Sequence, residues 1–383
     1  AAFLFSFVQR HTQSMIERIA ILGTGLIGGS LALSWQERRP DATIVGYDRP
    51  EVLETAEDRG AIDAKAADPV TAVSDADVIV LATPVGSILR LLESIADAIP
   101  DGAIVTDVAS VKTPVFDQVA DVLPDDVSFL GGHPMAGAES SGIAHADALL
   151  FENAIYALCL RDGESRDQLP STYADAVDLI EATGARTLLL DAETHDRLAA
   201  VVSHLPQVLA VALVNTVADT DDPDNLLLDL AAGGFRDMTR IASSPFDMWR
   251  DIFVGNEGNL LDAIGAFGRS LQRLRNRLIA DDFDELEEAF TRADETRSQI
   301  PRDQKGFLQP LADIYVRAED RPGVLHDLTG HLAGAGLNVK DVELQTYRKG
   351  TGGTFRFSFE SDDDANRAVE ALSDVGYEAR RPA

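Results

Sequence analysis

Short apolar runs alternate with longer amphipathic stretches over residues 16–190. A buried strand of a parallel sheet reads as a short apolar run, and the helix that crosses to the next strand reads as a longer segment with one apolar face. The runs that we expect to form strands are residues 19–22, 43–47, 78–81, 103–106, 127–130, 154–158 and 186–190. This alternation predicts an α/β domain with a doubly wound parallel sheet.

After residue 190 the strand signals stop and apolar helical segments follow. Acidic capping residues at 191–194 precede a long apolar helix that we expect to run to about residue 217. Further helices are expected over residues 224–232, 246–279 and 282–299. An apolar helical block of this length rarely stands alone, so we expect residues 191–300 to be a dimerisation and substrate domain of a homodimer.

A third pattern begins at residue 311, after a linker over residues 301–310. It predicts the order βαββαβ of a ferredoxin-like unit over residues 311–383. The expected elements are strands at 311–318 and 377–380, helices at 324–335 and 364–374, and two strands joined across 349–353. Met15 stands just before the first strand, so we expect residues 1–15 to be a tail or an upstream extension outside the fold.

Acidic residues outnumber basic ones by 64 to 33, which gives the 383 residues a net charge of −31. So negative a surface repels nucleic acid and anionic membranes, and neither is an expected partner. Such self-repulsion destabilises a fold at low ionic strength, and molar salt screens it to within about 3 Å, so we expect a halophilic protein. The single Cys159 fits the reducing cytoplasm and excludes a thiolate metal site.

A glycine-rich turn follows the first expected strand. Gly23 permits a tight turn, Gly25 lets the backbone approach a pyrophosphate, and Gly28 lets the next helix pack against the strand. Asp48 ends the second strand, where a carboxylate accepts both ribose hydroxyls of NAD; Arg49 beside it leaves NADP open. The expected cofactor-binding residues of this Rossmann-type domain are Gly23, Thr24, Gly25, Leu26, Ile27, Gly28, Asp48, Thr83 and Pro84.

Three further segments carry candidate catalytic groups. Ser110 follows the fifth strand, where its hydroxyl can bond a substrate alcohol and a base, or else cap the next helix. His133 follows the sixth strand, and Pro134 stiffens the backbone beside it, which suits a general base. Arg240, in the helical block, can hold a carboxylate through two hydrogen bonds, or belong with Arg236 to a solvated arginine pair.

With these residues in view, the chain resembles the prephenate/arogenate dehydrogenase family of tyrosine biosynthesis over residues 16–300. The motifs that carry the resemblance are Gly-Thr-Gly-Leu-Ile-Gly-Gly-Ser at 23–30, Asp-Val-Ala-Ser-Val-Lys at 107–112, His-Pro-Met-Ala-Gly at 133–137, Thr-His-Asp at 194–196, Ser-His-Leu-Pro at 203–206, Gly-Phe-Arg-Asp-Met-Thr-Arg-Ile-Ala at 234–242 and Met-Trp-Arg-Asp-Ile at 248–252. The resemblance implies NAD-dependent oxidative decarboxylation of prephenate to 4-hydroxyphenylpyruvate, with arogenate to tyrosine as the alternative.

The resemblance also implies roles for single residues. His133 would take the proton from the ring hydroxyl, Ser110 would bond the same oxygen, and Arg240 would hold the ring carboxylate. Glu139 is a weaker candidate for ordering or gating the site. Many family members carry a second histidine where this chain has Gln207, a candidate contact for the substrate side chain. Glutamine cannot be cationic, so the choice between prephenate and arogenate stays open.

The last unit resembles an ACT domain through Asp-Arg-Pro-Gly-Val-Leu at 320–325 and Gly-Leu-Asn-Val at 336–339. The resemblance implies an amino-acid effector, tyrosine, facing Gly323 and Asn338. The alternative is a purely structural dimerisation module.

Two other functions compete with this interpretation. The β-hydroxyacid dehydrogenases also join a Rossmann domain to dimerising helices, but they use a lysine on the long interdomain helix, and this chain has no lysine between Lys112 and Lys305. A non-catalytic sensor of NAD and an amino acid would not need a proton acceptor such as His133. The histidines have no accompanying cluster of metal ligands, so no metal is expected. His195 and His204 are interpreted as structural.

Overall fold

The computed structural model describes residues 16–124, 127–137, 140–160, 171–220, 226–299, 311–348 and 352–382. The chain forms two compact units that meet in sequence at Glu287 and Glu288, within α13 (Phe283–Ser298). Each unit is described by itself. The domain boundaries expected at residues 190 and 310 stay predictions.

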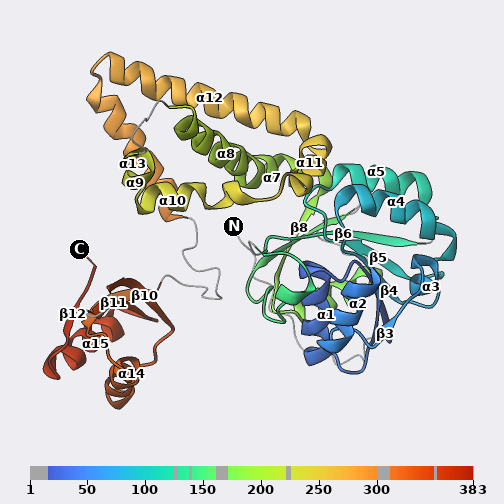
Figure 1. Cartoon of the computed structure of the whole chain (residues 1–383), viewed down its shortest axis with the longest axis horizontal. Coiled ribbons are helices and arrows are strands. Elements are labelled where there is room, and N and C mark those ends of the chain that lie inside the picture. Colours follow the sequence, from blue (N-terminus) through green and yellow to red (C-terminus); the bar gives the residue numbers. More distant parts are fainter. Residues whose placement is uncertain are drawn as a thin grey trace. The chain divides into compact units, whose positions relative to one another are not determined.

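The first unit contains an eight-stranded sheet in the order β3-β2-β1-β4-β5-β6-β7-β8 (Figure 1). Its strands are β1 (Arg18–Leu22), β2 (Thr43–Tyr47), β3 (Ala64–Lys65), β4 (Val78–Leu81), β5 (Ile104–Asp107), β6 (Ser128–Pro134), β7 (Ile155–Leu160) and β8 (Arg186–Asp191). The order confirms the doubly wound sheet of the Rossmann type. One pair differs from the expected parallel arrangement, because β7 runs antiparallel to β6. An apolar run does not encode its direction, and mixed sheets of this kind are common.

Helices cover both faces of this sheet, and the alternation of side chains along β1 shows why. Ile19 and Ile21 pack on one face with Leu31 and Trp35 of α1 (Leu26–Arg38). Ala20 and Leu22 pack on the other face with the buried residues of the helices that follow β4 and β5. Burial of each large apolar side chain stabilises the fold by roughly 1.5–3 kcal/mol. The remaining helices of this part are α2 (Pro50–Asp58), α3 (Pro69–Val73), α4 (Val85–Ile95), α5 (Thr113–Val122) and α6 (Ser171–Glu181).

The helical part of the first unit begins with one continuous helical run over residues 192–218. It consists of α7 (Ala192–Ala199), the π-helical turn η3 (Ala200–His204) and α8 (Leu205–Ala218), and it confirms the long apolar helix. Among the described residues, this run is the one helix whose length and composition would allow it to cross a membrane. Its polar side chains His195, Asp196, His204 and Gln207 are nevertheless buried against the rest of the unit. That burial indicates a helix packed inside a protein.

The helix expected over residues 246–279 is interrupted, which corrects the sequence prediction. Asn256 separates α11 (Phe246–Gly255) from α12 (Glu257–Ile279). Its buried side-chain amide donates to the Asp196 carbonyl at 2.7 Å, a contact that no local pattern encodes. The shorter elements of this part are α9 (Leu226–Leu230), α10 (Gly233–Thr239) and η4 (Arg240–Ser243).

The second unit holds an antiparallel sheet in the order β10-β11-β9-β12, which confirms the ferredoxin-like arrangement. Its elements are β9 (Ala312–Ala318), α14 (Val324–Gly334), β10 (Asp341–Arg348), β11 (Gly352–Phe359), α15 (Asp362–Asp374) and β12 (Glu378–Arg380). Ile314 and Val316 alternate with outward residues along β9 and pack with Leu328, Leu332 and Leu372 of the two helices. The unit therefore has a hydrophobic core of its own.

Candidate active site

The glycine turn has the shape that a dinucleotide needs. Gly23 has a φ of +104°, and a Cβ there would lie 2.5 Å from the Ala82 carbonyl oxygen, so only glycine fits. A Cβ at Gly28 would lie 2.0 Å from the Gly23 carbonyl oxygen, whereas one at Gly25 would meet open space. No side chain caps the first turn of α1, which Leu26 and Ile27 begin. Its backbone N–H groups can therefore receive a pyrophosphate.

Asp48 lies against this turn at the end of β2. Its Oδ2 atom accepts from the backbone N–H of Thr24 at 2.8 Å, and its Oδ1 atom accepts from the backbone N–H of Arg49 at 2.7 Å. The carboxylate is thereby fixed beside the phosphate-binding turn, where a ribose would lie. Arg49 is exposed, 3.9 Å from Asp48 and 3.7 Å from Glu51.

Thr83 and Pro84 close the other side of the turn, between β4 and α4. A Cβ at Gly23 would lie 2.8 Å from the Cγ2 atom of Thr83, so the two segments touch. At the start of α4, the backbone N–H of Gly86 donates to the Oδ2 atom of Asp251 at 2.8 Å. Asp251 belongs to α11, so this bond joins the sheet to the helical part of the same unit.

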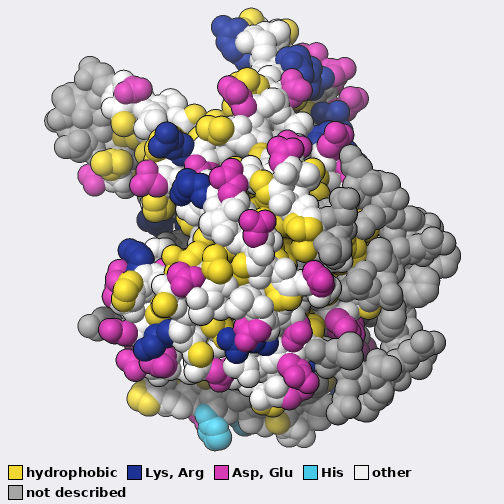
Figure 2. All heavy atoms as spheres, turned by 90° about the vertical axis from the view of Figure 1, so that its right-hand side faces the viewer, with side chains coloured by type: hydrophobic (Ala, Val, Ile, Leu, Met, Phe, Trp, Pro, Cys, Tyr) yellow, Lys and Arg dark blue, Asp and Glu magenta, His cyan; other side chains and the backbone are white. Residues whose placement is uncertain are grey.

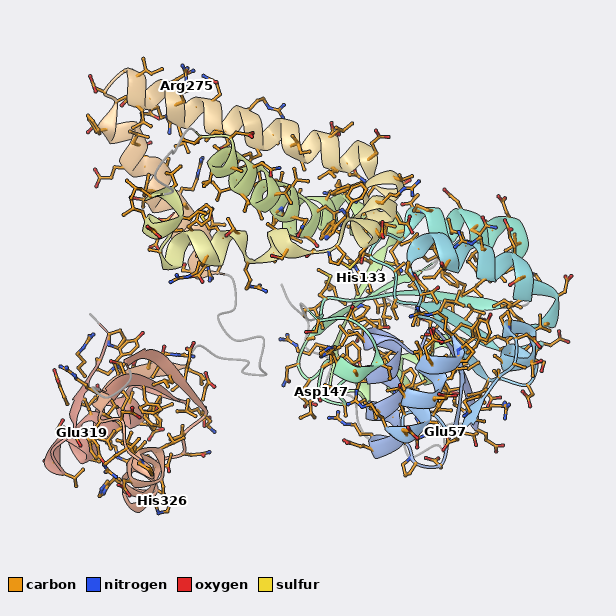
Figure 3. The ribbon with its side chains drawn as sticks, in the orientation of Figure 1. Glu57, His133, Asp147, Arg275, Glu319 and His326 are labelled. Atoms are coloured by element: carbon orange, nitrogen blue, oxygen red, sulfur yellow. The ribbon has the colours of Figure 1, made fainter. Side chains whose placement is uncertain are left out.

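His133 lies on β6 at the edge of the sheet that meets the helical run (Figure 3). Its Nδ1 atom is 2.8 Å from the Nε2 atom of His195, and the Nδ1 atom of His195 is 2.9 Å from the Oδ1 atom of Asp196. Asp196 can only accept, so His195 carries its proton on Nδ1 and accepts from His133 through Nε2. Neutral His133 therefore carries its proton on Nδ1, and its Nε2 lone pair remains to receive a proton from a substrate.

The Asp196 carboxylate is anchored by the start of α5. Its oxygens accept from the backbone N–H groups of Lys112 at 2.7 Å and Thr113 at 2.8 Å. Burial by itself raises the pKa of Asp196, but the hydrogen bonds from His195, Thr113 and Lys112 together outweigh it and lower the pKa below the ordinary value. Asp196 therefore stays ionised and orients His195.

The surroundings of His133 keep it neutral. The residue is 7% exposed. Burial lowers its pKa most, and electrostatic interactions with His195, Lys112 and His204 lower it further, to well below the ordinary 6.5. Burial likewise lowers the pKa of His204 to about 4. A neutral imidazole is the form that a general base requires.

Ser110 and Gln207 lie in the same region. The half-buried Ser110 has its backbone next to His204, whose Nδ1 atom is 3.3 Å from the side-chain nitrogen of Asn256. Gln207 is buried on the first turn of α8, one helical turn after His204. The exposed Arg240 begins η4, which packs against α8, the helix of Gln207. Glu139 lies outside the described residues.

The sequence interpretation gave His195 and Asp196 no role in the site, although both belong to a motif of the family resemblance, and it did not consider Asn256. A signal was present, because Thr-His-Asp at 194–196 opens the long helix directly after a strand of the sheet. The contact between His195 and His133 could not be predicted from the sequence, because the two residues are 62 positions apart. Among the described residues, no group of three or more His, Cys, Asp or Glu side chains could hold a metal ion.

Three family models match successive stretches of the chain. The nucleotide-binding domain of prephenate dehydrogenase matches residues 31–189, its dimerisation domain matches residues 191–292, and the ACT domain matches residues 312–376. Prephenate dehydrogenase of Bacillus subtilis (strain 168) is 36% identical over 360 residues, which cover 94% of this chain and 96% of the relative. Cyclohexadienyl dehydrogenase of Zymomonas mobilis is 32% identical over 292 residues, 76% of this chain and 98% of the relative.

Solved structures agree with these sequence matches. Prephenate dehydrogenase from A. aeolicus, crystallised with hydroxyphenyl propionate and NAD+, has a TM-score of 0.69 and 32% identity. The match covers 76% of this chain and all of that chain. Arogenate dehydrogenase from Synechocystis has a TM-score of 0.64 and 30% identity, over 74% of this chain and 99% of that chain.

Proposed function

The chain belongs to the prephenate dehydrogenase family, and from that membership we propose that it converts prephenate and NAD+ into 4-hydroxyphenylpyruvate, carbon dioxide and NADH. The observation that supports the proposal most is the series His133–His195–Asp196 at the edge of the sheet. It supplies a neutral, oriented base in a domain that has a phosphate-binding turn. The homologue solved with NAD+ and hydroxyphenyl propionate supports the same chemistry.

The protein contributes little covalent chemistry to this reaction. The Nε2 atom of His133 takes the proton from the ring hydroxyl of prephenate, and Ser110 bonds the same oxygen. Bound NAD+ supplies a hydride acceptor for the hydrogen on the alcohol carbon. Loss of the ring carboxylate as carbon dioxide makes the ring aromatic, and the proton returns from His133 to the phenolate oxygen. Arg240 holds the ring carboxylate, so positioning and charge neutralisation are the main contributions of the chain.

The substrate side chain is assigned to Gln207, with Glu139 as a candidate for gating the site. Gln207 lies buried on α8, and its amide can bond a keto acid or an amino acid. Arogenate is therefore the second candidate substrate, and the similarity to the Synechocystis enzyme supports it.

The cofactor preference follows from Asp48. Its carboxylate is fixed by the Thr24 and Arg49 backbone, and it would repel the 2′-phosphate of NADP. The residues that hold NAD in this proposal are Gly23, Thr24, Gly25, Leu26, Ile27, Gly28, Asp48, Thr83 and Pro84.

The active form is proposed to be a homodimer in the cytoplasm. In the single chain, α12 and the helical run before it expose apolar side chains: Val201, Val202, Val211, Val214, Leu261, Ile264, Phe267 and Leu271. Exposed apolar surface of this extent marks an interface, and the match to a dimerisation domain supports a second copy as its partner.

The ACT unit is proposed to bind tyrosine as an effector. Gly323 has a φ of +83° and precedes α14, and the exposed Asn338 precedes β10. Deletion of residues 310–383 is expected to abolish inhibition by tyrosine. Unchanged inhibition in the truncated enzyme would assign the unit to dimerisation alone.

Product analysis tests the proposed reaction. Purified protein with prephenate and NAD+ is expected to form NADH, carbon dioxide and 4-hydroxyphenylpyruvate in equal amounts. The H133N variant keeps a hydrogen-bonding side chain but has no base. Its rate is expected to be about 10²–10⁴-fold lower than that of the unchanged enzyme. Unequal products, or an H133N rate equal to that of the unchanged enzyme, would contradict the mechanism.

A further inference from the structure

A buried ion pair lies beside the base, and the mechanism above does not use it. Asp107 ends β5, and Lys112 lies just before α5; both side chains are 0% exposed, and the Nζ atom of Lys112 contacts the Oδ2 atom of Asp107. A buried ion pair is weak evidence for stability, since apolar residues of the same volume often do as well or better. Its position relative to His133 therefore calls for a separate explanation.

The ion pair forms hydrogen bonds with the backbone of Gly132, the residue that precedes His133. The Oδ1 atom of Asp107 accepts from the backbone N–H of Gly132 at 2.9 Å, and Lys112 donates to the carbonyl oxygen of Gly132. The ladder between β5 and β6 ends at Thr106 and Leu130, so these side chains continue the link beyond the ladder. On the other side, β7 pairs with β6 through His133 itself. The backbone at His133 is thereby held from both sides.

The ion pair also contributes to the electrostatic potential at the imidazole of His133. The positive charge of Lys112 lowers the pKa of His133, after burial and His195 in importance and ahead of His204. From α7, Asp196 is occupied by its bond to His195. From β7, Tyr156 and Cys159 stay neutral, because burial raises the pKa of each, that of Cys159 to about 12.

We propose that Lys112, held by Asp107, is a positioning residue for His133: it fixes the Gly132 peptide that precedes the base and keeps a positive charge buried beside it. This inference rests on the proposed function, in which His133 is the base. Loss of the lysine charge would favour protonation of His133, and the uncompensated Asp107 would favour it further. The expected shift is about one to two pH units, as for a unit charge several ångström away at an effective dielectric constant of about 20.

The test measures the titration of His133 by NMR in the full-length protein without substrate, labelled at histidine Cε1. The His133 signal is assigned by its absence from H133N. In the unchanged protein its midpoint is expected below pH 6.5. K112M is expected to raise the midpoint by about one to two units, and the D107N/K112M double variant by less, because no bare carboxylate remains. K65M, which breaks the exposed Lys65–Glu57 pair instead, is expected to leave it unchanged.

The acid limb of kcat/KM against pH is expected to shift with the NMR midpoint. An unchanged midpoint in K112M or in the double variant would leave the pair a structural role only and overturn the inference. If K112M fails to fold, the His133 midpoint of the D107N/K112M variant tests the inference. If both variants fail to fold, a His133 midpoint at or above pH 6.5 in the unchanged protein overturns the inference. The titration needs no turnover, so failure of the proposed reaction would appear separately, as absence of NADH formation.

Discussion

At the scale of single residues, His133 is defined by what it touches rather than by its own chemistry. Asp196 fixes the proton of His195, and His195 in turn fixes the proton of His133. The identity of His133 as a candidate base was predictable from its place after a strand, with Pro134 beside it. Its tautomer was not, because it depends on His195 and Asp196 of α7, which are distant in sequence. The low pKa was not either, because it depends chiefly on the burial of the side chain in the folded protein.

The pH dependence of the reaction follows from this environment. Burial, followed by electrostatic interactions with His195, Lys112 and His204, places the pKa of His133 well below 6.5. The base is therefore neutral above that pKa and is lost only as the pH falls through it. We expect kcat/KM for prephenate to stay level from pH 8 to below 6.5 and then to decline about tenfold per pH unit.

The profile should be measured at constant ionic strength, so that salt effects do not mimic a titration. A midpoint at or above 6.5, with chemistry limiting the rate, would be incompatible with a desolvated His133 as the base.

Substrate choice is expected to depend on Gln207. Q207H would place a side chain that can be cationic where the substrate side chains differ. A positive charge disfavours the ammonium group of arogenate, so the ratio of kcat/KM for arogenate to that for prephenate is expected to fall about tenfold at pH 6, for roughly 1.4 kcal/mol of repulsion.

Q207N serves as the neutral control and is expected to leave the ratio within about threefold. An equal fall in Q207N and Q207H would show that shape, not charge, decides the effect.

At the scale of elements, the sequence predicted the βα alternation, the long apolar helix and the βαββαβ unit, because each is encoded by local periodicity. Two features escaped. The reversed direction of β7 depends on strand pairing and not on apolar runs. The break at Asn256 arises because its amide bonds the Asp196 carbonyl, 60 residues away. Both features depend on tertiary contacts that a local sequence pattern does not encode. The break at Asn256 also belongs to the hydrogen-bond network that orients the base.

The helix that carries His195 begins at a side-chain cap. The Oδ1 atom of Asp191 accepts from the backbone N–H of Thr194 at 2.7 Å. D191A is expected to lower the free energy of unfolding by about 1 kcal/mol in urea titrations at pH 7, since a first-turn N–H loses its acceptor.

The matched control is D117A, an exposed aspartate inside α5, for which a change within about 0.5 kcal/mol is expected. Equal effects of the two substitutions would refute the cap as the source of stability.

At the scale of the whole molecule, the net charge of −31 is the dominant property. Figure 2 shows acidic side chains scattered over one face of the molecule and not gathered in a single patch. A diffuse charge of this kind acts on the stability of the fold and not on one binding site.

Salt is therefore expected to stabilise the protein. Screening shortens from about 10 Å at 0.1 M to about 3 Å at 1 M, so Tm should rise steadily as potassium chloride increases from 0.1 M to 2 M. Thermal unfolding followed by circular dichroism measures this. Full stability and activity in dilute buffer would refute the expectation of a halophilic protein.

The most direct measurement is NAD+ reduction with prephenate and with arogenate, side by side, in molar potassium chloride. We predict rapid NADH formation with prephenate and a lower kcat/KM with arogenate. A preference for arogenate would keep the mechanism and contradict the substrate assignment. No turnover of either, by protein shown to be folded and bound to NAD+, would contradict the proposed function itself and favour a sensor of NAD and an amino acid.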